Sequence, residues 1–166
     1  NVLKESGGVA FSVRGILKRF YWSRTLLVIL LTVLLLIPGA LTGAGSVTVL
    51  ITGGMVAVVL ETMGVSRVRT AAIVFIIAGL SAAAPPVSLW AMMTAAGVNM
   101  PYVGFFWPLL LPCVILSLAT IFLLGWKGEK IDLEKALEGL PEPPEGMGWG
   151  KVFLPLLVFG ALIFVG

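Results

Sequence analysis

The stretch LTGAGSVT, residues 41–48, decides the fold because it sets loop-forming residues inside a strongly apolar run. No charged residue occurs from 25 to 60, so nothing near this stretch is polar enough to draw it into water. As continuous helix, residues 25–60 would reach about 54 Å, whereas two complete crossings need about 60 Å and a turn. We therefore expect residues 25–62 to form a re-entrant helical hairpin whose tip, 43–46, stops inside the bilayer.

The composition of the chain indicates an integral membrane protein. Of its 166 residues, 59% are hydrophobic and 11% are charged, whereas about a quarter of the residues in soluble domains are charged. A second uncharged run extends from 70 to 126, and both runs exceed the roughly 20 apolar residues that one helix needs to cross a bilayer. The expected fold is all-α and embedded in the lipid bilayer.

The residues that carry most enzyme and metal chemistry are missing. The chain has no histidine and one cysteine, Cys113, so it cannot build an internal disulfide, a Cys-x-x-Cys pair or a Cys/His metal site. Glu61 borders an apolar run, but Arg67 and Arg69 follow it, and we expect this carboxylate to be solvated or ion-paired. We expect no catalytic residues, no enzyme activity and no cofactor, with Cys113 as a packing residue.

The basic residues indicate how the chain is oriented. All eleven Lys and Arg fall before residue 25, in the loop at 67–69, or within 127–151, whereas the connection at 97–104 is uncharged. Because basic loops stay on the cytoplasmic side, the three basic places are predicted to be cytoplasmic and 97–104 to face outward. The basic residues thus follow a membrane topology, which argues against nucleic acid as a partner.

Two further segments have recognisable physical signatures. Residues 1–24 combine an apolar stripe with Arg14 and Lys18, and aromatic residues follow, so we expect an amphipathic arm helix lying in the membrane interface. Proline lacks an N–H, so Pro85 and Pro86 must interrupt the crossing at 70–96 and divide it into two half-helices.

The rest of the chain is expected to continue the membrane topology. Residues 104–125 return to the cytoplasm as a transmembrane helix, and 126–151 form a charged, proline-containing cytoplasmic linker. Residues 152–166 would begin the next transmembrane helix, but this apolar segment is short for a full span. We therefore expect the chain to be a piece of a longer polypeptide.

The two interruptions are the candidate binding sites. Irregular backbone persists in hydrocarbon only where it lines a cavity or is buried by protein. Its carbonyls can ligate a small cation, and the helix restarting at Val47 directs free N–H groups and a positive dipole end at an anion. Packing is the alternative, because Gly39 and Gly43 form a GxxxG pattern and the segment SAAAPPVS, 81–88, can be a structural kink. Both interpretations stay open at this stage.

The order of these features resembles the first inverted repeat of the large membrane subunit of TRAP transporters, the tripartite ATP-independent periplasmic carriers. The tip in that family usually reads Ser-Gly-Ser, and here 43–46 is GAGS. The broken helix of the family reads Gly-x-Ile-x-Pro-Pro-Ser, and here 82–88 is AAAPPVS, with Val87 where a serine is frequent. The stretch GVNMPYVGFFWPLLLP, 97–112, and a charged linker then follow in the family's order.

The resemblance implies half of an elevator-type, sodium-coupled secondary transporter in the inner membrane that imports a carboxylate-bearing solute. A periplasmic binding protein would deliver the solute, a small membrane subunit would complete the complex, and 104–125 would be a scaffold helix. Carried onto this chain, the sodium site of the family maps to Gly43, Gly45, Ser46, Ala83, Ala84 and Pro85. The solute is expected at the two half-helix N-termini, at Ser46, Val47, Thr48, Val87 and Ser88.

Three other functions remain compatible with the sequence. The chain could belong to another ion-coupled anion carrier of the same superfamily. It could be a non-transporting membrane scaffold or assembly subunit, in which case GAGS would be a plain turn at the outer surface. It could also be a permease driven by an ATPase, with residues 132–140 as the cytoplasmic coupling helix.

Overall fold

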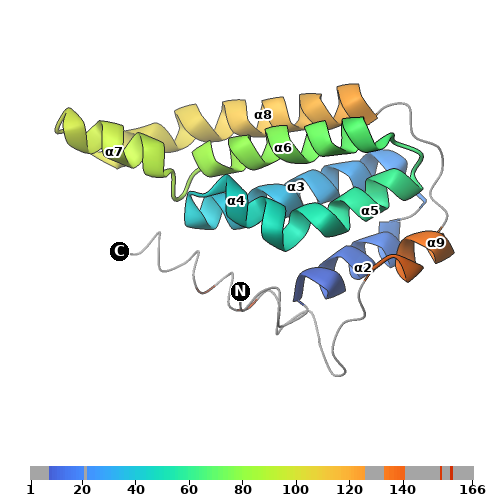
Figure 1. The fold of residues 1–166 in the computed structure, drawn as a ribbon. Coiled ribbons are helices and arrows are strands. Elements are labelled where there is room, and N and C mark those ends of the chain that lie inside the picture. The colour runs from blue at the N-terminus through green and yellow to red at the C-terminus, as the bar shows by residue number, and fades with distance from the viewer. Residues whose placement is uncertain (1–7, 21, 126–132, 141–153, 155–157, 159–166) are drawn as a thin grey trace.

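The computed structural model describes residues 8–20, 22–125 and 133–140, together with residues 154 and 158, and every element with bounds in this part of the chain is a helix (Figure 1). The all-helical expectation is confirmed for these residues. The expected linker at 126–151 is described only at 133–140, and the expected further helix at 152–166 lies outside the described residues except at 154 and 158. The helices are α2 (Gly8–Phe20), α3 (Arg24–Thr42), α4 (Gly45–Thr48), the π-helix η1 (Val49–Gly53), α5 (Gly54–Thr62), α6 (Arg67–Ala83), α7 (Leu89–Gly97), the 3-10 helix η2 (Tyr102–Phe105), α8 (Phe106–Gly125) and α9 (Leu133–Glu138).

A tight turn joins α3 to the helix that returns beside it. Gly43 ends α3 in the left-handed conformation, with φ 67°, and its N–H donates to the Gly39 carbonyl. Glycine suits this position because a side chain would strain a left-handed residue. Ala44 is extended, and helix resumes at once in α4, which runs through η1 into α5. The quoted stretch therefore forms the turn of a helical hairpin.

Three described helical stretches are long and apolar enough to cross a membrane. They are 24–42, 45–62 and 102–125, and the third combines η2 with α8. Such lengths agree with the roughly 20 residues that a crossing requires. The protein is therefore a multi-pass membrane protein by length and composition.

The helix at 70–96 is divided where the two prolines lie. α6 ends at Ala83, residues 84–88 are not helical, and α7 begins at Leu89. Proline cannot donate a backbone hydrogen bond and its ring clashes with the preceding turn, which explains why helix stops here. α7 continues past the end of the hairpin, so the hairpin tip lies at the level of the break (Figure 1).

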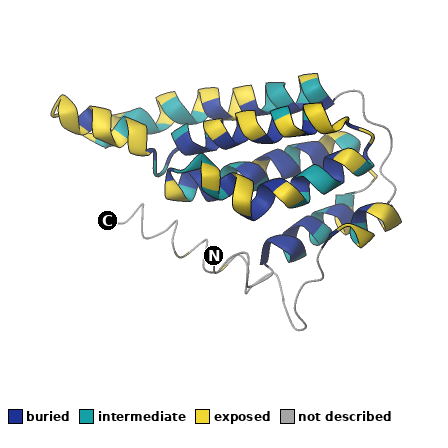
Figure 2. Ribbon diagram, viewed as in Figure 1, coloured by how far each residue is buried: buried dark blue, intermediate teal, exposed yellow. Residues whose placement is uncertain are grey.

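α3, α6 and α8 pack side by side around a largely apolar core. Leu31, Leu35, Ile73, Ile77 and Ile121 are fully buried between them. The outward faces are also apolar, with large side chains exposed along α6, α7 and α8 (Figure 2). Hydrophobic residues on both faces are what a helix bundle surrounded by lipid requires.

The arm helix α2 lies against protein. Val9, Val13 and Leu17 on its apolar stripe are buried in the same core as residues of α5, and α2 and α9 contact each other and α5. One guanidinium nitrogen of Arg14 donates to the carbonyls of Leu137, at 3.0 Å, and Leu140, at 2.7 Å. The stripe that we expected to face lipid is therefore covered by the hairpin.

An ion pair joins the end of α5 to the start of α6. The Nε atom of Arg67 lies 3.5 Å from a carboxylate oxygen of Glu61, and the Arg67 side chain is 90% exposed. An exposed pair of this kind adds little stability. The ion-paired role expected for Glu61 is confirmed.

Candidate solute and cation site

The two interruptions of helical structure meet directly. The Val87 N–H in the break donates to the Ala40 carbonyl near the end of α3, at 3.0 Å. Gly43 is buried, and a Cβ atom placed on it would lie 2.9 Å from the Val87 carbonyl oxygen and 2.8 Å from Leu89 Cγ. Only a residue without a side chain allows this approach. We call this contact between residues 39–48 and 78–89 the tip–break junction.

A pair of buried hydroxyls holds the return helix against α6. Thr48 Oγ1 and Ser81 Oγ lie 2.9 Å apart, and both residues are fully buried. Ser81 has one hydroxyl proton and donates it to the Ala78 carbonyl at 2.7 Å, so Thr48 is the donor to Ser81. Two polar groups are thereby satisfied without water at a place where unpaired groups would be costly.

Gly39 completes this contact from the other arm of the hairpin. A Cβ atom on Gly39 would overlap Ser81 Oγ and would lie 2.6 Å from Ser81 Cβ and 2.7 Å from Thr48 Oγ1. The close-packing interpretation of the Gly39–Gly43 pattern is therefore supported by the structure. Packing and irregular backbone occur together here, so the two interpretations of this stretch do not exclude each other.

The six residues expected to hold a cation lie at the junction, and they differ in how far they are buried. Gly43, Ala84 and Pro85 are buried, and Gly45 and Ala83 are half-buried. Gly45 packs so closely on α6 that a Cβ atom would lie 2.5 Å from the Ala78 carbonyl oxygen. Ser46 is the exposed member of the six expected residues. The buried hydroxyl residues at the junction are instead Thr48, Ser81 and Ser88.

The residues expected to bind the solute occupy both half-helix starts. Val47 is half-buried next to Ser46 at the start of α4, and Thr48 is committed to Ser81. At the other start, the Val87 N–H is committed to Ala40. The N–H of Ser88, which is buried, lies 3.3 Å from the Tyr102 hydroxyl and donates to it.

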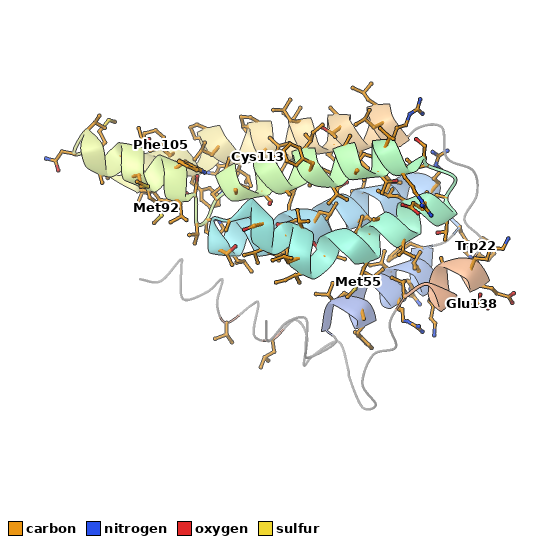
Figure 3. All side chains as sticks on the ribbon, viewed as in Figure 1. Trp22, Met55, Met92, Phe105, Cys113 and Glu138 are labelled. Carbon is orange, nitrogen blue, oxygen red and sulfur yellow. The ribbon has the colours of Figure 1, made fainter. Side chains whose placement is uncertain are left out.

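Tyr102 and Ser81 are the residues at or beside the junction that sequence reasoning missed, whereas Cys113 is the packing residue that we expected. Tyr102 reaches α7 from the uncharged connection at 97–104. Cys113 on α8 is buried against Ala40 and Ala84, so α8 covers the junction from one side (Figure 3). The sequence offered a weak signal for Ser81, which is the first residue of SAAAPPVS, and none for the pairing of Tyr102 with α7.

The junction contains no formal charge. The sequence has no Asp, Glu, Lys or Arg in 25–60 or 70–126, and the described residues contain no cluster of His, Cys, Asp and Glu that could hold a metal. Any ion bound at the junction would be bound by carbonyl oxygens, hydroxyls and helix ends. Such groups are the ligands that discontinuous helices offer in membrane carriers.

Comparison with known proteins identifies the family. A family model described as "DcuC: C4-dicarboxylate anaerobic carrier" matches residues 1–142, a range that includes the hairpin, the broken helix, α8 and α9. No curated protein and no solved structure matches the chain. The match confirms a membrane carrier family and is not a match to the TRAP family. The chain belongs to the DcuC family of C4-dicarboxylate anaerobic carriers.

Proposed function

We propose that this chain is part of a secondary transporter for C4-dicarboxylates, and that the tip–break junction binds the solute together with a sodium ion. The observation that carries the proposal is the direct contact of two interrupted helices, joined by the hydrogen bond from Val87 to Ala40. The family supports the class of solute. The chemistry of the junction supports the way in which the solute is bound.

A dicarboxylate needs positive potential in a segment that has no cationic side chain. The helix that begins at Gly45 and the helix that begins at Leu89 each present N–H groups and the positive end of a helix dipole. Ser46, Val47 and Thr48 line the first helix start, and Val87 and Ser88 line the second. Each carboxylate of the solute would be bound at one of these helix starts.

A sodium ion would offset the second negative charge. Hard cations prefer oxygen ligands, and the backbone carbonyls of Gly43, Gly45, Ala83, Ala84 and Pro85 with the Ser46 hydroxyl provide them at the junction. A cation bound between the tip and the break would hold the two segments together. Its binding would thereby favour the arrangement that binds the anion, which is the basis of coupled transport.

The lengths of the helices support a site within the membrane. α6 has 17 residues and reaches about 25 Å, and α7 has 9 residues and adds about 13 Å. The break then lies about two thirds of the way through this crossing, and the hairpin tip lies beside it. We propose a re-entrant hairpin that moves with α6 and α7 in an elevator mechanism, with α8 as the scaffold helix.

Transport of a C4-dicarboxylate such as succinate by the complete protein in liposomes tests the proposal. Uptake should require an inward sodium gradient and should not respond to ATP. Ser46→Ala should weaken the apparent sodium affinity by up to roughly tenfold, because one hydroxyl ligand is lost. Pro85→Ala keeps the backbone carbonyl but restores an N–H that lets helix continue through the break, so it should also weaken the apparent sodium affinity. Unchanged sodium affinity in both variants would remove the cation assignment, whereas the family membership would stand.

The TRAP resemblance adds finer expectations, which we retain as proposals. They are an inner-membrane location with the N-terminal segment and 126–151 in the cytoplasm, a small membrane subunit, and a periplasmic binding protein that delivers the solute. Liposomes that contain the purified protein alone distinguish these possibilities. Uptake of free solute without any added protein would exclude an obligatory binding protein and leave a simpler ion-coupled carrier.

A further inference from the structure

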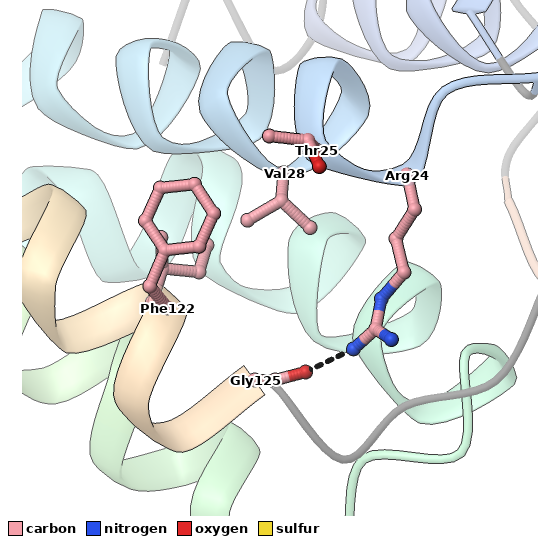
Figure 4. A pocket seen from close by; sticks show the side chains of 6 residues that line it. Arg24, Thr25, Val28, Phe122 and Gly125 are labelled. Atoms are coloured by element: carbon pink, nitrogen blue, oxygen red, sulfur yellow. Dashed lines mark hydrogen bonds between the residues drawn. The ribbon is translucent and has the colours of Figure 1, made fainter.

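A cleft between α3 and α8 lies apart from the tip–break junction. Its volume is about 240 Å³, and its lining residues are Arg24, Thr25, Val28, Ile121, Phe122 and Gly125 (Figure 4). Arg24 and Thr25 begin α3, and Gly125 ends α8. The cleft thus lies at the opposite end of α3 from the hairpin tip.

The cleft is polar at its mouth and apolar beyond it. Arg24 is the first residue of one stretch that is long enough to cross a membrane, and Gly125 is the last residue of another. Both therefore belong at the depth of the lipid headgroups. Val28 lies about one helical turn after Thr25, and Ile121 and Phe122 lie about one turn before Gly125, so the apolar lining is on the hydrocarbon side of the cleft. This order of groups matches a phospholipid, which has a charged head and apolar tails.

The Arg24 side chain is held at the mouth of the cleft. One guanidinium nitrogen donates to the Gly125 carbonyl at 2.5 Å, which satisfies an end carbonyl of α8 (Figure 4). A guanidinium has further N–H donors in a fork that suits phosphate oxygens. Lys18 and Arg19 are exposed in the last turn of α2, shortly before Arg24 in the chain, and they increase the positive potential at this end of the molecule.

We propose that this cleft is a binding site for an anionic phospholipid. Arg24 binds the phosphate, and an acyl chain lies along Phe122, the half-buried apolar residue of the lining. Charge complementarity at headgroup depth, combined with an apolar wall, favours this occupant, because basic pockets between membrane helices select anionic lipids. The bound lipid would bridge α3 and α8. This proposal does not depend on the transport function.

Native mass spectrometry of the purified protein in detergent tests the site with two lipids of equal tails, phosphatidylglycerol and phosphatidylethanolamine. The unaltered protein should retain phosphatidylglycerol in preference. Arg24→Gln should reduce that preference by about fivefold, the attraction of one basic residue for an anionic lipid. Arg67→Gln is the matched control, because Arg67 is exposed at the start of α6 and pairs with Glu61. It should leave the preference unchanged.

A second measurement keeps Arg24 intact. Phe122→Trp puts a fluorophore in the cleft. Quenching is measured for this variant and for the protein without the substitution, and the difference reports the cleft. Brominated phosphatidylglycerol should increase this difference more than brominated phosphatidylethanolamine does. Equal quenching by the two lipids would overturn the proposal. Equal losses of phosphatidylglycerol in Arg24→Gln and Arg67→Gln would also overturn it, because the attraction would then be a property of the whole basic surface.

Discussion

Gly39→Ala is the substitution that most directly tests the contact between the hairpin and the broken helix. The added Cβ atom would overlap Ser81 Oγ and would lie 2.6 Å from Ser81 Cβ and 2.7 Å from Thr48 Oγ1. These atoms belong to short, buried side chains on two helices, so they cannot turn away into open space. The hairpin must move off α6, or the Thr48–Ser81 hydrogen bond must break.

The expected cost follows from these two contributions. Overpacking a tight core costs about 1–3 kcal/mol, and a buried hydrogen bond contributes about 0.5–1.5 kcal/mol. A loss of about 2–4 kcal/mol would lower the Tm of a domain of this size by roughly 10 °C. Because the contact aligns the tip with the break, sodium-driven uptake should fall together with the Tm.

Thermal unfolding in detergent, followed by tryptophan fluorescence, measures the effect, with Gly54→Ala as the matched control. Gly54 is also helical and borders the π-helix, but a Cβ atom there would meet nothing within 4 Å. Gly54→Ala should keep or slightly raise the Tm, since alanine favours helix. Adding Ser81→Gly to Gly39→Ala removes the nearest clashes and should recover part of the loss. Equal Tm values for Gly39→Ala and Gly54→Ala would refute the packing argument.

Three further predictions concern the rest of the molecule. Ser46→Cys should react with impermeant thiol reagents added outside, and sodium with solute should slow this reaction. The protein without the substitution, which has the buried Cys113 alone, gives the background labelling. Equal labelling of Ser46→Cys under all conditions would favour a plain surface turn. Tyr102→Phe frees an N–H at the start of α7 for the solute, so the apparent KM should fall by up to several-fold with little change in Tm; an unchanged or higher KM would argue against solute binding there. Arg14→Gln removes hydrogen bonds to the end of α9 and should therefore speed proteolysis near residue 140. Arg19→Gln, which changes an exposed residue of α2, should leave the cleavage rate unchanged. Equal cleavage rates in the two variants would show that Arg14 does not hold α9.

The elements at the junction show why some features followed from the sequence. Two uncharged runs predict membrane helices because hydrocarbon excludes ionised groups, and this holds whatever the helices pack against. The turn at Gly43 and the break at Pro85 are also local properties, since they depend on the backbone conformations that single residues permit or exclude. The short motifs were too weak to identify the family: they indicated a carrier, and the comparison supported that level but not the TRAP family.

The sequence by itself therefore determined that the chain is a helical membrane protein, and it predicted where helix is interrupted. Only the tertiary structure decided that the tip meets the break, that Gly39 packs against Ser81, that Tyr102 reaches α7 and that Arg24 binds the end of α8. It also turned the stripe on α2 towards protein. Each of these contacts joins residues far apart in the chain. Their formation depends on how each helix is rotated and how deep it sits beside its neighbour, and side-chain packing between helices fixes those variables.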